Sequence, residues 1–288
     1  MNLTSIDAAT ALGPVRLTVA DVPRVRAFYE RALGLRPLAH GDEALVLGTP
    51  GGTRLVELKE RADAAPRGGG ASGLFHLALL YPSSVELARA LRRVVQASGQ
   101  LTGASDHLVS EALYLSDPEG NGIELYRDRP REEWTHGPNG ELQMATLPLD
   151  LPALLAAAPE DEVAAAIPDG TRMGHVHLQV SDLEPAEAFY AGVLGFDVMV
   201  RSYPGALFVA AGGYHHHIGL NTWASRGGPP NAPSARGLDR FVVQLPSDDA
   251  LAAVAARLAE AGSATRSEDG GLLVADPFGN EVLLRPAA

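Results

Sequence analysis

The chain has 288 residues, a net charge of −12 and no cysteine. The negative charge does not suggest a nucleic-acid partner or an anionic membrane, and the lack of cysteine excludes disulfides, thiolate zinc sites and cysteine nucleophiles. A hydrophobic fraction of 46% supports a substantial core. No apolar run is long enough for a membrane helix, and residues 1–13 lack the order of a signal peptide, so a cytoplasmic location is expected.

The first predicted elements occur twice. Residues 15–35 are echoed by residues 176–196 at a constant offset. In each copy, alternating apolar residues indicate a strand, an aspartate (Asp21 or Asp182) stands at the N-cap position, and a glycine ends an amphipathic helix. The chain therefore contains an internal repeat.

A second pair of copies follows the first. Residues 73–83 match residues 237–247, and each precedes a helix rich in Ala, Leu, Val and Arg. Each copy ends in a strand–turn–strand, at residues 114–126 and 273–285, around the sequence Asp-Pro-x-Gly-Asn. This five-residue sequence is typical of a turn, because Pro presets φ and Gly or Asn accepts positive φ.

These repeats predict four units that each run strand, helix, then several strands. The N-terminal pair occupies residues 1–128 (units 12–60 and 73–128), a connector with a short helix spans 129–171, and the C-terminal pair occupies 172–288 (units 172–223 and 237–286).

The paired Asp-Leu…Phe-Tyr…Leu-Gly helices and the Asp-Pro-x-Gly-Asn hairpins resemble the vicinal oxygen chelate superfamily of glyoxalase I, fosfomycin and bleomycin resistance proteins, and extradiol dioxygenases. The resemblance implies an α+β fold in which four βαβββ modules form two cup-shaped mixed β-sheet barrels with helices outside. Two stretches, Gly213–Trp223 with its three consecutive histidines and Asp106–Asp117, resemble more narrowly the four-module catechol 2,3-dioxygenase-like branch.

In this superfamily a module can donate a metal ligand at the start of its first strand or in the middle of its last strand. The first-strand positions hold Pro14, His76, His175 and Arg240, and the last-strand positions hold Glu57, Glu124, Gly219 and Leu283. The resemblance therefore implies that His76, His175 and Glu124 bind the metal. Two imidazoles and a carboxylate suit Fe(II), Mn(II) fits the same ligands, and zinc is not excluded by ligand type. Glu57 is a fourth candidate, which we interpret instead as a solvated edge residue.

This ligand set also constrains the architecture. Because the first and fourth modules lack the required residues, the second and third must face each other, and the first and fourth would form a metal-free cup. The pairing could occur within one chain or across a homodimer, and the sequence leaves both open.

The resemblance further implies catalytic roles for three residues: His216, Tyr114 and His107. Histidine suits proton transfer near neutral pH, and Tyr114 would donate to a substrate oxygen. The three consecutive histidines run directly into β-type residues, so we expect them to lie on a strand. His215, His217 and His177 are assigned to the substrate pocket, although a regular strand would turn His215 and His217 away from His216.

The expected function is an extradiol dioxygenase that uses Fe(II) and O2 to open a catechol. Two alternatives remain open. One is a glyoxalase-like metal-dependent lyase or isomerase, which usually needs a second glutamate. The other is a non-catalytic protein of the same fold that binds an aromatic ligand and confers resistance. Fold alone does not decide among these functions.

Overall fold

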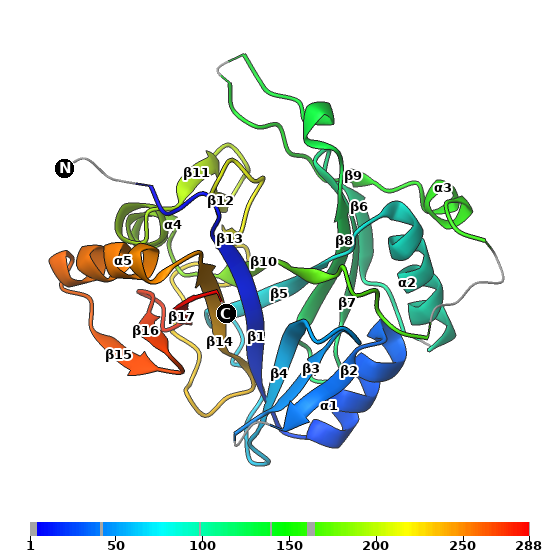
Figure 1. Ribbon diagram of the computed structural model, residues 1–288, viewed down its shortest axis with the longest axis horizontal. Helices are drawn as coiled ribbons and strands as arrows, with labels where there is room; N and C mark the ends of the chain where they lie inside the picture. Colours follow the sequence, from blue (N-terminus) through cyan, green and yellow to red (C-terminus); the bar gives the residue numbers. More distant parts are fainter. Residues whose placement is uncertain (1–4, 41–42, 98, 139, 160–164, 288) are drawn as a thin grey trace.

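The computed structural model describes residues 5–287 except 41–42, 98, 139 and 160–164. Its fold is α+β, and the described strands form two curved mixed sheets (Figure 1). In strand order, the eight-stranded sheet contains β15 (Thr265–Glu268), β16 (Gly271–Ala275), β17 (Glu281–Pro286), β14 (Gly237–Leu245), β1 (Ala11–Val19), β4 (Arg54–Glu60), β3 (Leu45–Gly48) and β2 (Arg36–His40).

The second sheet has nine strands in the described part of the chain. In order these are β11 (Asp197–Val200), β12 (Ala206–Ala210), β13 (Ile218–Asn221), β10 (Arg172–Gln179), β5 (Gly73–Leu80), β8 (Gly122–Asp128), β7 (Ser110–Ser116), β6 (Gly103–Asp106) and β9 (Leu147–Pro148). At its centre, β5 pairs antiparallel with β10. The centre of the other sheet is the antiparallel pair of β1 and β14.

Each sheet therefore joins one module from each half of the chain. The second and third modules form the nine-stranded sheet, and the first and fourth form the eight-stranded sheet. This is the pairing that the ligand positions require, and it occurs within a single chain. We call the curved interior of the nine-stranded sheet the metal cup and that of the eight-stranded sheet the arginine cup.

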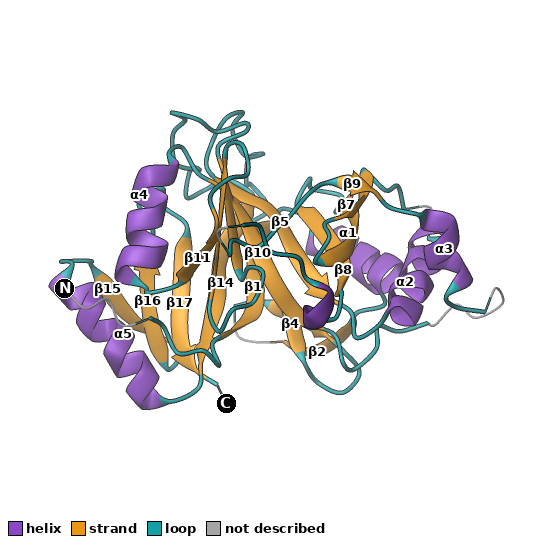
Figure 2. Cartoon of the chain, turned by 90° about the horizontal axis from the view of Figure 1, so that it is seen from above, coloured by secondary structure: helices purple, strands orange, loops and turns teal. Residues whose placement is uncertain are grey.

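The helices lie outside the sheets (Figure 2). Helices α1 (Val22–Phe28) and α5 (Asp248–Glu260) pack on the eight-stranded sheet, and α2 (Ser84–Gln96) and α4 (Leu183–Glu187) pack on the nine-stranded one. As predicted, Asp21 and Asp182 cap their helices by accepting from the backbone N–H groups of Arg24 and Glu184. Such caps satisfy amide groups that have no partner inside the helix.

Both copies of the first helix change to π geometry where they approach the glycine. The π segments are η1 (Tyr29–Leu33) and η3 (Ala188–Val193). The chain turns at Gly34 in the left-handed conformation, with φ of 74°, which glycine adopts without a steric penalty. The fully buried rings of Tyr29 and Tyr190 lie in these segments and belong to the core.

The Asp-Pro-x-Gly-Asn turns form as predicted. The Asp117 carboxylate accepts hydrogen bonds from the backbone N–H groups of Glu119 and Asn121. Asp276 repeats this arrangement in the fourth module. The turn fixes the register of the hairpin, in which Tyr114 pairs directly with Glu124.

The connector contributes more than a link between halves. It contains η2 (Arg131–Glu133), strand β9 and helix α3 (Leu151–Ala156). Strand β9 pairs with β6 and extends the nine-stranded sheet. In the described residues, no helix is long and apolar enough to cross a membrane.

Candidate metal centre

Three buried side chains converge at the centre of the metal cup. His76 lies on β5, His175 on β10 and Glu124 on β8, three strands that are adjacent in the sheet. Glu124 Oε2 lies 3.0 Å from His76 Nε2 and 3.1 Å from His175 Nε2. The two Nε2 atoms are 3.3 Å apart. The structure therefore brings together the three ligands that the sequence predicted from two different modules.

These separations fit a shared metal ion. Neighbouring ligands on an octahedral ion with bonds of about 2.1 Å lie about 3.0 Å apart, and on a tetrahedral ion slightly farther. Two imidazoles and one carboxylate also leave coordination positions open. The donor set suits a divalent transition metal, and the three atoms face one another without an intervening side chain.

The charge states at the site favour metal binding at neutral pH. Burial lowers the pKa of His175 to about 4, against an opposing effect of Glu124. Burial raises the pKa of Glu124, but the charge and hydrogen bond of His175, followed by those of His76, outweigh it and leave this pKa well below the usual value. At neutral pH, Glu124 is therefore ionised, and burial keeps His175 neutral, so that His175 then acts on Glu124 through its hydrogen bond; these are the forms that bind metals.

His107 and Tyr114 form a hydrogen-bonded pair beside the ligands. His107 Nε2 lies 2.6 Å from the Tyr114 hydroxyl, and His107 Nδ1 lies 2.6 Å from the carbonyl oxygen of Ala145. A carbonyl can only accept, so Nδ1 carries a proton. Burial, followed by the charge of Glu124, raises the pKa of Tyr114 well above its usual value. The phenol is thus protonated and can donate to His107 when that imidazole is neutral.

His216 stands at the end of a second polar chain. Its Nδ1 is 2.8 Å from Nδ1 of His215, and His215 Nε2 is 2.9 Å from Asp128 Oδ1. With Asp128 ionised, His215 Nε2 carries the proton that binds it. A neutral His215 then accepts from His216 Nδ1–H. Burial, followed by the charge of His175, lowers the pKa of His216 well below its usual value. The neutral ring of His216 therefore has its lone pair on Nε2.

The three consecutive histidines do not form a strand, which differs from the prediction. Residues 211–217 are a loop, and β13 begins only at Ile218. His216 lines the cavity of the metal cup, but His215 and His217 do not. His217 instead accepts a hydrogen bond from the Ala211 backbone N–H, and its ring lies 4.9 Å from that of Tyr214. The side chains nevertheless lie on the sides that strand alternation would give, with His216 toward the cavity and His215 and His217 away from it, although the backbone here is a loop.

His177, which the sequence assigned to the substrate pocket, lines the cavity. It is buried, and its ring centroid lies 5.0 Å from that of His76. Its space depends on Gly219, its cross-strand partner on β13. A Cβ at Gly219 would lie 2.9 Å from Cγ of His177. Glycine at the last-strand position of the third module therefore makes room for the imidazole.

The cavity above the ligands has a volume of about 420 Å³, within the range of about 300–1,000 Å³ that is common for small-molecule sites. Aromatic side chains make up much of its wall, with Phe75, Phe208 and Trp223 among them. Thr146 of the connector reaches the wall and shares a hydrogen bond of 2.7 Å with Tyr203.

Sequence reasoning missed several of these contributions. Asp128 lies four residues after Glu124 on β8, so strand periodicity places both on one face and could have identified it. The wall residues Phe75, Phe208, Trp223 and Tyr203, together with the connector residues 144–146, carry no comparable signal, because they come together only through the tertiary fold.

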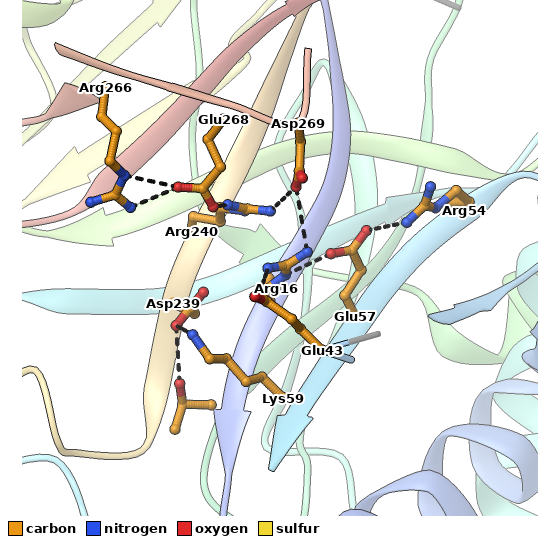
Figure 3. A network of polar contacts seen from close by, with 11 residues as sticks. Arg16, Glu43, Arg54, Glu57, Lys59, Asp239, Arg240, Arg266, Glu268 and Asp269 are labelled. Atoms are coloured by element: carbon orange, nitrogen blue, oxygen red, sulfur yellow. Dashed lines mark hydrogen bonds and ion pairs between the residues drawn. The ribbon is translucent and has the colours of Figure 1, made fainter. Parts of the chain in front are cut away.

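Two of the four equivalent positions in the arginine cup, Glu57 and Arg240, hold charged side chains (Figure 3), and the other two hold Pro14 and Leu283. Glu57 is only 5% exposed and binds Arg16, with 2.7 Å between Oε2 and Nε. The interpretation of Glu57 as a solvated edge residue was therefore wrong. Arg240 is buried and pairs with Glu268 and Asp269. Glu57 lies in this other cup and is not a fourth ligand of the candidate metal centre.

The paired modules and the candidate metal site of two histidines and one glutamate are the features of a glyoxalase-like fold. The model of the Glyoxalase/Bleomycin resistance protein/Dioxygenase superfamily matches residues 11–125 and 172–284, and the chain belongs to this superfamily. Catechol-2,3-dioxygenase of Bacillus subtilis (strain 168) is 44% identical over 279 residues, which cover 96% of each sequence. The resemblance found in the sequence is thereby confirmed.

Solved structures show the same fold at low sequence identity. A Bacillus subtilis strain 168 protein, provisionally described as a dioxygenase, superposes with a TM-score of 0.66 at 13% identity, covering 98% of this chain and 86% of the other. Glyoxalase I from Zea mays gives a TM-score of 0.57 at 17% identity, with coverage of 96% and 92%. At these identities the likeness concerns the fold alone.

Proposed function

We propose that the chain is an extradiol ring-cleavage dioxygenase of the catechol 2,3-dioxygenase type, which opens catechol or a substituted catechol beside the diol with Fe(II) and O2. The observation that carries the proposal is the convergence of His76, His175 and Glu124 below an aromatic cavity that His216 and Tyr114 also line. The 44% identity to a catechol-2,3-dioxygenase over nearly the whole chain supports it. Mn(II) suits the same ligands.

His76, His175 and Glu124 would hold the metal. When bound, the ion would supply Lewis acidity and coordination positions that the three side chains leave open. The protein contributes one negative charge through Glu124, since both histidines bind in the neutral form. The remaining positive charge favours a deprotonated diol.

His216 is the proposed base or acid on one side of the cavity. Its neutral ring has a lone pair on Nε2, while Nδ1–H is engaged by His215. Asp128 and His215 act as positioning residues, because they fix the tautomer of His216. Nε2 can take a proton from a diol hydroxyl and return it later in the reaction.

Tyr114 and His107 are proposed to handle the second hydroxyl. With His107 neutral, Tyr114 donates to His107 Nε2, so its oxygen accepts from the substrate. With His107 protonated, the bond reverses and Tyr114 donates to the substrate, the role expected from the sequence. The pair can therefore pass a proton between substrate and His107 without a change in side-chain positions.

Oxygen uptake tests the proposal directly. The protein is loaded with Fe(II) without air, mixed with catechol and exposed to O2. Both oxygen atoms enter the ring-opened semialdehyde, so we expect a yellow product and equimolar use of O2 and catechol, without added reductant. If none of several catechols causes O2 uptake, the proposed function is wrong.

A matched pair of variants tests the metal site. Glu124→Gln removes a charged ligand, so metal affinity should fall by more than the roughly 10- to 100-fold that is typical when a group orienting a ligand is lost. Glu57→Gln makes the same chemical change in the arginine cup and should leave affinity unchanged. Metal content after dialysis and calorimetric titration measure both. Equal loss in the two variants would contradict the site.

A further inference from the structure

The arginine cup encloses a second cavity that the proposed reaction does not use. Its volume is about 480 Å³. Four arginines line it, namely Arg16, Arg54, Arg240 and Arg285. The carboxylates that line it are Glu43, Glu57 and Asp269.

Three of the four arginines are already matched by carboxylates (Figure 3). Glu57 binds Arg16 and Arg54 through its two oxygens, each at 2.7 Å. Arg240 is held by Glu268 and Asp269. Glu57 is the buried carboxylate among these partners, whereas the side chains of Glu268 and Asp269 are partly exposed.

Arg285 on β17 is the exception. It is partly buried and lines the cavity, yet in the part of the chain that the structure describes its guanidinium has no hydrogen bond or ion pair. Burial lowers the pKa of Arg285, and the like charge of Arg54 lowers it further. Its guanidinium, which carries five N–H donors, therefore lines the cavity without a protein acceptor among the described residues.

The floor of the cup beside these arginines is apolar. Val46, Val242 and Leu283 line the cavity and are at most 4% exposed. In the metal cup, the position of Leu283 is occupied by Glu124, so the arginine cup has an apolar surface where the other has a metal ligand. The site therefore offers a cationic rim and an apolar floor.

We propose that the arginine cup binds a small monocarboxylate with an apolar body, whose carboxylate is held by Arg285 and Arg54 and whose body packs on Val46, Val242 and Leu283. A guanidinium binds a carboxylate through two parallel hydrogen bonds. Among the described residues, Arg285 is the cup arginine without a carboxylate partner, which matches a single negative charge. A dianion such as phosphate would instead bring excess negative charge near Glu57 and Asp269.

Calorimetric titration of the full chain with sodium benzoate at low salt tests this inference. Benzoate should bind, and benzamide, which has the same shape without the charge, should not. Arg285→Gln should weaken benzoate binding about tenfold or more, since it removes a charge-assisted bidentate contact. Arg266→Gln, which alters an exposed arginine paired with Glu268, should leave it unchanged.

Two further variants keep the test decisive. Arg54→Gln should also weaken binding, and it leaves Glu57 paired with Arg16, so the fold is retained. Glu124→Gln lies in the metal cup and should not affect benzoate. The inference is overturned if benzoate does not bind, if benzamide binds equally well, or if Glu124→Gln abolishes binding while Arg285→Gln does not.

Discussion

His215, His216 and His217 are chemically identical and adjacent, yet the structure gives each a different environment. His216 faces the cavity, His215 links His216 to Asp128, and His217 lies outside the cavity wall against Tyr214. The backbone explains the separation. His217 is anchored by hydrogen bonds of its N–H to Val209 and of its carbonyl to Val176, while the two residues before it belong to the loop.

Because His217 is buried, we predict that the free energy of unfolding depends on pH. Burial lowers its folded-state pKa from 6.5 to about 3. The unfolded chain therefore takes up a proton as pH falls below 6.5, and the folded chain does not until about pH 3. The stabilisation is complete above pH 6.5 and is lost as pH falls towards 3. From pH 7 to 5, the metal-free protein should lose on the order of 2 kcal/mol through this group.

His217→Gln tests this pH effect, because glutamine can still accept from the Ala211 N–H but does not titrate. Urea denaturation at several pH values should show a flatter dependence for this variant. His136→Gln is the control, since His136 lies exposed in the connector. A parallel pH profile for His217→Gln and the parent protein would rule out the effect.

At the scale of elements, local sequence chemistry predicted the hairpins and the helix starts. The Asp117 turn fixes how β7 and β8 pair, so the ten-residue spacing of Tyr114 and Glu124 becomes direct cross-strand contact. The same reasoning failed for the loop of residues 211–217. The β-type residues that follow suggested that the histidines belong to a strand. In the structure, residues 211–217 are a loop, and the strand begins only at Ile218.

The close contact between Gly219 on β13 and His177 on β10 predicts that a larger side chain at position 219 lowers stability. Gly219→Ala places a methyl group 2.9 Å from the ring of His177, so one of the two strands must shift. Overpacking of this kind costs about 1–3 kcal/mol, which urea denaturation would measure as a lower midpoint. Gly69→Ala is a matched control, because a Cβ there meets no atom within 4 Å. Equal midpoints for the two variants would show that the strands adapt without cost.

For the whole molecule, the positions of the metal ligands along the sequence predicted which modules pair. A metal needs His76 and Glu124 from the second module and His175 from the third, so those modules had to meet. The sequence could not decide between pairing in one chain and across a dimer, since both satisfy the same ligands. It also carried no sign that Arg16 and Glu57 would form a buried ion pair in the other cup.

Because both sheets cross between halves, neither half should be complete alone. Residues 1–171 lack β10 and β14, the strands that pair with β5 and β1. Residues 172–288 in turn lack β5 and β1. Each fragment would expose the central edge of two sheets, which favours aggregation. We expect neither fragment to bind the metal tightly, and co-expressed fragments to recover binding as a complex on size-exclusion chromatography. Full metal affinity in residues 1–171 alone would show that His175 is dispensable and that the two-module centre is wrong.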